Sequence, residues 1–380
     1  MAKWNYVKIG DVCTVERGGS PRPIDKFITD DTNGINWIKI GDATDSMYIT
    51  EAAQKIIPEG MKKSRYVQPG DFLLSNSMSF GRPYILKIDG CIHDGWLVLR
   101  DNGGVFDKRF LYYYLSSPST YQKFKNMAVG GVVNNLNSDM VRGVTVPIPK
   151  MEEQIEIVQT LDNVSNLIFL RKQQLAKLDE LVKARFVEMF GDPVVNPKGF
   201  PCYTVGEVID FQGGSQPDKK YFEYELSPDN IRLIQIRDYK SDKYITYIPK
   251  TMAKRFCTAD DIMIGRYGPP IFQILKGIEG SFNVALMKAT PKVGNREFVR
   301  QFLKQDCLLE YLEGLSKRTA GQDGIQMDKL KAYPFPYPPI DLQEQFAAFV
   351  TQTDKSKVAV QKALDEAQLL FDSLMQKYFG

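Results

Sequence analysis

The chain has 380 residues, a formal net charge of +3 and 43% hydrophobic residues, which is typical of a globular protein with two or three domains. A charge so close to neutral excludes a broadly basic protein, so any surface for a nucleic acid has to be local. The five cysteines form no Cys-x-x-Cys pair, which argues against zinc ligation and a disulfide framework. A polar start and the lack of a long apolar run favour a cytoplasmic protein without a membrane span.

An internal repeat with a spacing near 190 residues is the main feature of the chain. The matching segments are residues 7–12 with 204–208, 18–20 with 213–215, 35–42 with 231–238, 49–50 with 245–246, 70–74 with 260–264, 147–149 with 336–338, and 153–154 with 344–345. Both halves end in Phe-Gly, at residues 190–191 and 379–380. A period this long indicates two copies of one domain, because the repeats of solenoid proteins span only about 20–50 residues.

Each half begins with a mixed domain, at residues 1–150 and 193–340. Short runs rich in Ile, Val, Phe and Tyr, separated by Gly, Pro, Asn and Asp, predict short strands and long loops. The clearest predicted strands are residues 37–40, 71–74, 96–99 and 262–264, and the predicted helices are residues 108–115 and 296–304. A proline-rich segment that can continue neither a strand nor a helix ends each domain. The pattern indicates the α+β class.

A long helix closes each half, at residues 151–192 and 341–380. No Pro or Gly interrupts residues 151–190, and the Gly-Asp-Pro that follows predicts a stop. Apolar residues recur at heptad spacing, at Leu161, Val164, Ile168, Leu175, Leu178, Val182 and Met189, and at Phe346, Val350, Val360, Leu364, Ala367, Phe371, Leu374 and Tyr378. Such a pattern predicts a coiled coil, and the alternative is two amphipathic helices that pack separately on their own domains.

The order domain, helix, domain, helix constrains the arrangement. If the two helices pair, the short turn at residues 191–201 places the second domain at the far end, so the second helix returns antiparallel. This predicts a dumbbell with pseudo-two-fold symmetry. Arg171, Arg185, Thr353 and Lys357 interrupt the apolar seam. Because an unpaired buried charge is costly, we expect these charges to find acidic partners, reach solvent or mark a polar register point.

Sequence motifs for catalysis are weak in this chain. It contains neither a P-loop nor a Gly-x-Gly nucleotide loop, and its single histidine, His93, has no evident Ser or Cys partner. Asp229, Asp238 and Lys240 fit the loose pattern of metal-dependent nucleases, in which two carboxylates hold the metal. The aligned place in the first half holds Asp42 followed by Ala-Thr, which favours a structural acid at Asp238. The nuclease therefore remains the alternative function.

The whole chain resembles the specificity subunit of a type I restriction–modification enzyme. The most similar segments are the junctions at residues 147–154 and 338–346, the Gly-Gly-Ser openings, and residues 70–74, 260–264 and 178–192. The resemblance implies that each mixed domain is a target recognition domain that binds half of a split site on double-stranded DNA. It also implies that the helices set the spacer and dock two methyltransferase subunits, and that restriction/translocase subunits join the complex. Adenosylmethionine, ATP and Mg²⁺ are then expected only in the partner subunits, and this chain has no catalytic residues or cofactor.

Residues that could contact DNA lie in polar loops beside glycines, where Arg, Lys, Asn and Gln suit phosphates and base edges. They are Gly19, Ser20, Arg22, Ser75, Asn76, Ser77, Arg82, Asn134, Asn135 and Asn137 in the first domain, and Ser215, Gln216, Arg266, Tyr267, Lys317, Arg318 and Gln322 in the second. The residues expected to bind partner subunits are Leu161, Ile168, Leu175, Leu178, Val350, Leu364, Phe371 and Leu374. Two further alternatives stay open, a fused methyltransferase and a scaffold whose domains do not touch DNA.

Overall fold

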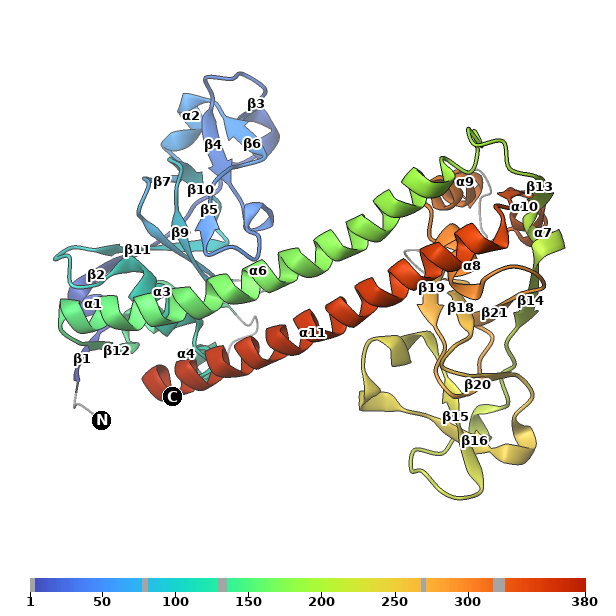
Figure 1. The fold of residues 1–380 in the computed structure, drawn as a ribbon. Helices are drawn as coiled ribbons and strands as arrows, with labels where there is room; N and C mark the ends of the chain where they lie inside the picture. Colours follow the sequence, from blue (N-terminus) through green and yellow to red (C-terminus); the bar gives the residue numbers. More distant parts are fainter. Residues whose placement is uncertain (1–3, 77–80, 129–134, 268–270, 317–324) are drawn as a thin grey trace. The chain divides into compact units, whose positions relative to one another are not determined.

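The computed structural model covers the chain, and the description is restricted to residues 4–76, 81–128, 135–267, 271–316 and 325–380. The chain forms two compact units: unit 1 comprises Met1–Lys172 and Lys362–Gly380, and unit 2 comprises Gln173–Gln361. Each unit holds one mixed domain together with parts of both long helices (Figure 1).

Unit 1 contains two sheets and a short ribbon. Its strands are β1 (Asn5–Lys8), β2 (Cys13–Arg17), β3 (Ile28–Thr29), β4 (Ile35–Ile38), β5 (Tyr48–Ile49), β6 (Gln54–Ile56), β7 (Arg65–Val67), β8 (Phe72–Ser75), β9 (Pro83–Leu86), β10 (Gly90–Ile92), β11 (Trp96–Asp101) and β12 (Thr145–Ile148). Its short helices are α1 (Ile9–Val12), α2 (Pro58–Met61), α3 (Lys108–Ser116), α4 (Pro118–Ala128) and α5 (Ser138–Arg142). The sheet orders are β2-β11-β8-β9-β5 and β3-β6-β4-β10-β7, and β1 pairs with β12.

Unit 2 repeats this plan. Its strands are β13 (Cys202–Thr204), β14 (Ile209–Gly213), β15 (Asn230–Ile234), β16 (Tyr247–Pro249), β17 (Phe256–Cys257), β18 (Ile262–Gly265), β19 (Gln273–Lys276), β20 (Gly280–Phe282), β21 (Leu286–Pro291) and β22 (Pro334–Pro336), and its short helices are α7 (Val205–Val208), α8 (Arg296–Leu303), α9 (Asp306–Ser316) and α10 (Met327–Ala332). The orders β14-β21-β18-β19 and β16-β15-β20-β17 match β2-β11-β8-β9 and β6-β4-β10-β7 strand for strand. In the described part of unit 2, a single bridge between Glu223 and Tyr247 of β16 takes the place of β3, and no strand corresponds to β5. The duplication inferred from the sequence is thus present in the fold.

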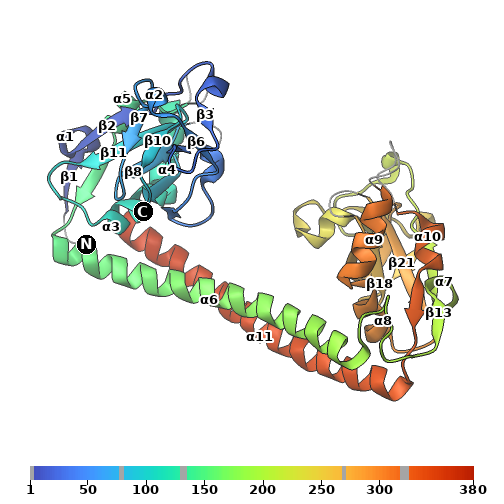
Figure 2. The same ribbon diagram turned by 90° about the horizontal axis from the view of Figure 1, so that it is seen from above.

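Residues Trp96–Leu99 of the inner strand β11 are buried on both faces of the main sheet of unit 1, which explains their continuous apolar sequence. In β11, Leu97 and Leu99 belong to the core that contains α3, whereas Trp96 and Val98 belong to a second core shared with Ile38 of β4. Unit 2 has the same two layers, and Figure 2 shows α8 and α9 beside β18 and β21. The strands and helices predicted in chain order are therefore confirmed, with ends shifted by one or a few residues.

The two long helices are α6 (Met151–Phe190) and α11 (Ile340–Phe379), with 40 residues each. Gly191, with a φ of +78°, follows α6 directly, and its N–H donates to the Val187 carbonyl at 2.8 Å. A left-handed residue in this place ends a helix, and glycine adopts that conformation without steric cost. The Gly-Asp-Pro stop is therefore confirmed.

Both helices contribute to the core of each unit. In unit 1, Ile157 and Leu161 from the start of α6 share a core with Met375 and Phe379 from the end of α11. In unit 2 the opposite ends meet, because Phe186 and Phe190 of α6 contact the ring of Phe346 in α11 at centroid distances of 5.5 and 5.4 Å. The helices therefore run antiparallel within each unit, and separate packing of each helix on its own domain is excluded.

A buried glutamine joins each long helix to its mixed domain. Gln154 accepts a hydrogen bond from the Asp107 N–H at 2.9 Å and donates to the Val105 carbonyl. Gln343 accepts from the Asn295 N–H at 2.8 Å and donates to the Pro338 carbonyl. Gln154 therefore corresponds to Gln343. The sequence had paired residues 153–154 with 344–345, which is wrong by two residues, because Glu and Gln occur more than once in this turn.

Candidate nucleic-acid interface and helix seam

A loop follows β2 in unit 1, which is called the first loop, and another follows β14 in unit 2, which is called the second loop. Each begins at a glycine that packs closely against the turn before β11 or β21. The Gly18 N–H donates to the Trp96 carbonyl at 2.9 Å, and the Gly214 N–H donates to the Leu286 carbonyl at 3.1 Å. A Cβ atom would lie 2.2 Å from the His93 carbonyl oxygen at Gly18, and 1.9 Å from that of Asn283 at Gly214. No side chain fits there, so both loops require glycine for the close approach of two backbone segments.

These bonds also correct the alignment of the Gly-Gly-Ser segments by one residue. The next N–H in each loop, of Gly19 and of Ser215, donates to the Ile92 and Phe282 carbonyls respectively. Gly19 therefore corresponds to Ser215, and Ser20 corresponds to Gln216 rather than to Ser215. Consecutive glycines made the sequence alignment ambiguous, and only the backbone hydrogen bonds define the register.

In the first loop, Ser20 and Arg22 lie beside Asp94, on the turn between β10 and β11. The Ser20 hydroxyl donates to Asp94 Oδ1 at 2.9 Å. Arg22 Nη2 lies 3.5 Å from Asp94 Oδ2, and its side chain is 82% exposed. The guanidinium is thus held at one edge and is otherwise free to contact a ligand. Sequence reasoning missed Asp94, because nothing in the sequence links it to a loop more than 70 residues away.

The neighbouring candidates Ser75 and Asn76 are buried. The Ser75 N–H donates to the Arg82 carbonyl at 3.0 Å, and the Asn76 side chain donates to the Asp94 carbonyl at 2.8 Å. In this structure both residues hold the surrounding loops, and their contact with DNA stays a prediction. Arg82 is half-exposed, pairs with Asp45 at 2.9 Å and lies over the ring of Tyr84.

Two of the remaining candidates of unit 1, Asn135 and Asn137, lie directly before α5. The Asn137 side chain accepts from the Met140 N–H at 2.8 Å and caps α5, and Asn135 is partly exposed. Ser77 and Asn134 lie outside the described residues. Asn137 therefore has a structural task, and its predicted contact with DNA is not tested.

In unit 2, Gln216 and Tyr267 are exposed, and Ser215 is partly buried. The Arg266 guanidinium lies 5.3 Å from the centroid of the Tyr267 ring and 3.5 Å from the Val284 carbonyl. Lys317, Arg318 and Gln322 lie outside the described residues. The structure therefore brings Arg266 and Tyr267 together beside the second loop.

The carboxylates of the nuclease alternative do not form a metal site. Asp238 has a side-chain exposure of 1%, and it accepts from the Gln235 N–H at 3.1 Å. Asp42 of unit 1 does the same for the Lys39 N–H at 2.7 Å. Burial raises the pKa of the Asp238 carboxyl, which suits a residue that closes its own turn. No cluster of three His, Cys, Asp or Glu side chains able to hold a metal occurs among the described residues.

The predicted partner-binding residues line the helix seam inside the chain. Leu161, Ile168 and Val350 are buried, and Leu175, Leu178, Leu364, Phe371 and Leu374 are partly buried. Leu161, Phe371 and Leu374 belong to the core of unit 1, and Val350 belongs to the core of unit 2. Their direct contact with a partner subunit is not tested.

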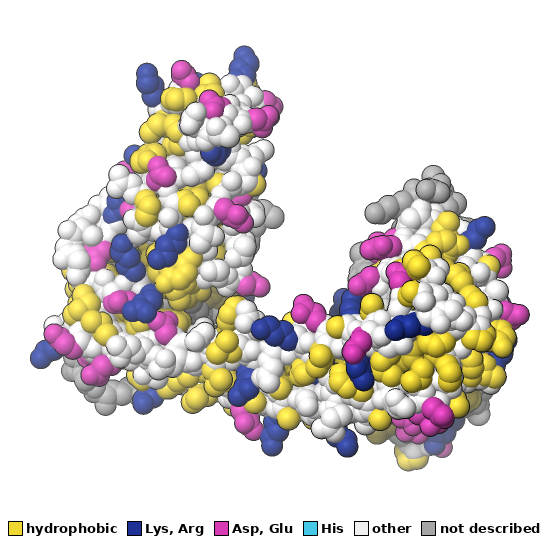
Figure 3. Space-filling model, turned by 45° about the horizontal axis from the view of Figure 1, so that its top comes forward, with side chains coloured by type: hydrophobic (Ala, Val, Ile, Leu, Met, Phe, Trp, Pro, Cys, Tyr) yellow, Lys and Arg dark blue, Asp and Glu magenta, His cyan; other side chains and the backbone are white. Residues whose placement is uncertain are grey.

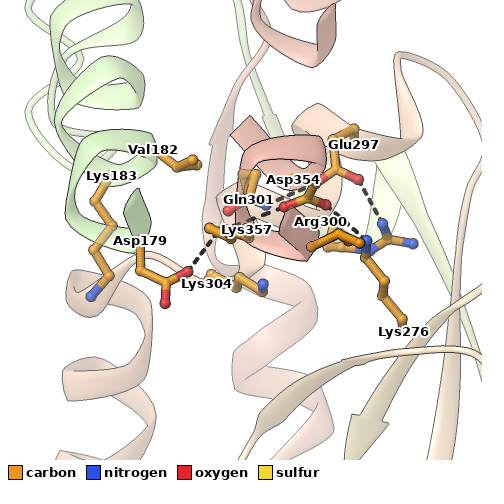
Figure 4. A pocket seen from close by; sticks show the side chains of 11 residues that line it. Asp179, Val182, Lys183, Lys276, Glu297, Arg300, Gln301, Lys304, Asp354 and Lys357 are labelled. Atoms are coloured by element: carbon orange, nitrogen blue, oxygen red, sulfur yellow. Dashed lines mark hydrogen bonds and ion pairs between the residues drawn. The ribbon is translucent and has the colours of Figure 1, made fainter. Parts of the chain in front are cut away.

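The charged seam residues have partners, as expected. Lys357 of α11 pairs with Asp179 of α6 at 2.6 Å and with Asp354 at 3.6 Å. These residues line a hollow of about 370 Å³ against α8, in which Lys276 pairs with Asp354 and Arg300 with Glu297 (Figure 4). Burial and neighbouring cations lower the pKa of Lys304 at the same hollow. Ion pairs at this hollow therefore link α11 both to α6 and to the second mixed domain.

The surface carries mixed charge. On the face drawn in Figure 3, Lys and Arg side chains alternate with Asp and Glu side chains over both units. Within the described residues, no helix is long and apolar enough to cross a membrane. A ligand with many negative charges would therefore meet local arginines in the loops rather than a broad basic surface.

Comparison with known proteins gives the family. The sequence profile described as the type I restriction modification DNA specificity domain matches residues 1–180 and 197–367. The chain belongs to this family. Two matches in succession agree with the duplicated fold, and they cover both mixed domains and most of both long helices.

Relatives of the family match 63% and 95% of the chain, and two solved structures match all of it. The specificity subunit of the type I restriction enzyme MjaVIII from Methanocaldococcus jannaschii is 22% identical over 95% of this chain and 90% of its own length. The MjaIX specificity subunit of the same organism is 24% identical over 63% of this chain and 64% of its own length.

A crystal structure of the type I restriction–modification S subunit from M. genitalium covers 100% of this chain and 96% of its own, with a TM-score of 0.57 and 16% identity. A chain solved in a study of the assembly and conformational transition of the type I system covers 100% of this chain and 98% of its own, with a TM-score of 0.58 and 19% identity. The α+β fold with alternating recognition domains and long helices is thus that of specificity subunits, and the chain is a type I DNA specificity subunit.

Proposed function

We propose that each unit binds one half of a bipartite site on double-stranded DNA and that the chain itself carries no catalytic centre. The observation that supports this most directly is the pair of equivalent loops at Gly18 and Gly214. The first two backbone hydrogen bonds of the two loops are equivalent, whereas the side chains that follow differ. Two similar domains with different loop chemistry suit the recognition of two different half-sites.

Family membership supports the lack of catalysis, and the structural role of Asp238 removes the one catalytic pattern that the sequence offered. Adenosylmethionine, ATP and Mg²⁺ would then bind to the methyltransferase and restriction/translocase subunits. The separation of recognition from chemistry is consistent with loops built from arginine, amide and hydroxyl side chains.

We assign the docking of two methyltransferase subunits to apolar side chains on the outer faces of α6 and α11. Phe169 in α6 and Val358 in α11 are 56% and 71% exposed, and they are 189 residues apart, as are the first residues of the two helices. Leu181 and Leu370 are related by the same spacing and are 47% and 50% exposed. Each unit thus holds one residue from each pair.

Exposed large apolar side chains on a helix indicate an interaction surface when they group together. Because the duplication presents the same kinds of residue twice, two copies of one partner fit better than a single copy. Substitution of Phe169 and Leu370 by Ser should remove one partner copy, and the matching substitutions at Val358 and Leu181 should remove the other.

The test of the proposed function is the methylated motif in a host that expresses the chain with its methyltransferase subunit. We expect a motif of two specific half-sites separated by unspecified bases. Exchange of residues 1–150 for the matching domain of a relative should change one half-site and leave the other intact. A motif that changes in both halves, or a chain that cleaves DNA alone with Mg²⁺, would contradict the proposal.

A further inference from the structure

The turn between β10 and β11 in unit 1 gathers polar side chains from distant parts of the chain around Asp94. Its carboxylate accepts from the Ser20 hydroxyl at 2.9 Å, lies 2.9 Å from His93 Nε2, and pairs with Arg22 at 3.5 Å. Its backbone carbonyl accepts from Arg17 Nε at 3.0 Å and from the Asn76 side chain at 2.8 Å. Asp94 thus holds both the first loop, at residues 18–22, and the residue that follows β8.

We propose that Asp94 is a positioning residue that determines the base preference of the half-site bound by unit 1. This inference rests on the proposed function, because it assumes that the loop at residues 18–22 contacts DNA. Asp94 acts through Ser20 and Arg22, which it holds in one arrangement, rather than through a contact of its own with the bases.

The pair with Asp94 preorganises the Arg22 side chain for binding. An arginine that contacts guanine through two parallel hydrogen bonds must hold its guanidinium plane in one orientation. The pair with Asp94 limits that orientation and leaves most of the side chain exposed. A side chain that is already oriented loses less conformational entropy when it binds, so its discrimination between bases is sharper.

The charge of Asp94 is compensated by its neighbours. Partial burial works against ionisation, but the Ser20 hydroxyl, His93, Arg17 and Arg22 together hold the pKa of the Asp94 carboxyl below its usual range. The residue is therefore a carboxylate at neutral pH. Without these cations and donors, a carboxylate beside a DNA backbone would repel it.

His93 fixes the shape of the turn from the other side. The Gly95 N–H donates to His93 Nδ1 at 2.9 Å, so the ring hydrogen faces Asp94 from Nε2. In unit 2 the equivalent bond runs from the Ala285 N–H to Asn283 Oδ1 at 3.1 Å. The backbone of the two turns is therefore held in the same way.

The residue that follows differs between the units. Asp94 corresponds to Val284, which is 45% exposed and offers only its carbonyl, to Arg266. The carboxylate is thus a property of the first recognition site alone. This difference predicts that loss of the carboxylate affects one half-site and leaves the other unchanged.

The experiment uses the full chain expressed with its methyltransferase subunits, and it reads the methylated motif by sequencing. In Asp94→Ala, methylation at sites with a single wrong base in the unit 1 half-site should rise about tenfold, as expected for one base contact. The other half-site should stay as strict as in the wild type. Asp94→Asn keeps an acceptor for Ser20 but not the charge, so its effect should be smaller.

Asp139→Ala is the matched control, because Asp139 pairs with Arg142 at 2.8 Å on the exposed side of α5 in the same unit. It should leave both half-sites unchanged. If Asp94→Ala does not fold, as judged by thermal unfolding, Asp94→Asn decides. Unchanged strictness of the unit 1 half-site in a folded Asp94 variant would overturn the inference. A wild-type motif without two half-sites would instead overturn the proposed function.

Discussion

The two units have the same backbone plan and differ in the chemistry of their loops. Both units have a glycine in close contact with the neighbouring turn, at Gly18 and Gly214. Both also attach a long helix to the mixed domain through a buried glutamine. The side chains on the turn before β11 or β21 differ, with Asp94 in the first unit and Val284 in the second. The two units therefore share these backbone contacts and differ in the side chains of the loops and turns beside them.

The corner where the mixed domain meets the two long helices shows a second difference. In unit 1 the Tyr113 hydroxyl donates to Asp162 at 2.6 Å, and its ring lies 6.1 Å from that of Phe371. In unit 2, Gln301 corresponds to Tyr113 and Val182 corresponds to Phe371. Both residues border the charged hollow of about 370 Å³. Both corners hold ion pairs, since Arg109 pairs with Asp162 at 2.6 Å in unit 1, but the aromatic contact of Tyr113 with Phe371 has no counterpart at Gln301 and Val182.

The largest expected effect tests the shared glutamine. Gln343→Ala leaves the buried Asn295 N–H and Pro338 carbonyl without partners, so we expect unit 2 to lose about 3 kcal/mol of stability. Gln154→Ala should destabilise unit 1 in the same way. Gln345→Ala, an exposed residue on the same turn, is the control and should cost less than about 0.5 kcal/mol. Urea unfolding monitored by fluorescence checks this, and an equal loss for Gln345→Ala would refute the shared anchor.

The glycines test whether the two loops act separately. Gly18→Ala places a Cβ against the His93 carbonyl and displaces the first loop, so binding to the first half-site should weaken roughly tenfold, or about 1.4 kcal/mol. Gly214→Ala should have the same effect on the second half-site only. Gly41→Ala meets nothing within 4 Å and serves as the control. The measurement is competition binding with DNA that carries one altered half-site, and a common loss at both would contradict separate loops.

The smallest effect concerns the charged seam. Lys357→Met removes the pairs with Asp179 and Asp354, whose side chains are 71% and 33% exposed, and ion pairs that reach solvent contribute at most about 1 kcal/mol. Stability should therefore change by less than about 1 kcal/mol, as it should in the exposed control Lys362→Met. Thermal unfolding at low and high salt measures both variants. A loss above about 3 kcal/mol for Lys357→Met would mean that the pair behaves as a buried one.

The sequence predicted the elements that repeat with a clear period. The duplication, the ends of α6 and α11, and the stop at Gly191 follow from apolar spacing and from Pro and Gly, which act locally. The alignment of the two halves was wrong by one residue at the Gly-Gly-Ser segments and by two residues at the Glu-Gln pairs. Repeated Gly, Glu and Gln residues allow several alignments of such short segments. The contacts of Asp94 were not accessible, since its partners Ser20 and Asn76 lie in loops that follow β2 and β8, far away in the sequence.

The most direct test of the central proposal, that each unit binds one half-site and that the helices set the spacer between the half-sites, is to lengthen the helices. One heptad inserted into each helix, near Ala176 and Ala363, keeps the apolar seam in register. It adds roughly 10 Å, or at most about three base pairs. Methylome sequencing should show the same two half-sites with a longer unspecified spacer, and a two-residue insertion should abolish activity. An active complex with an unchanged spacer would contradict the proposal.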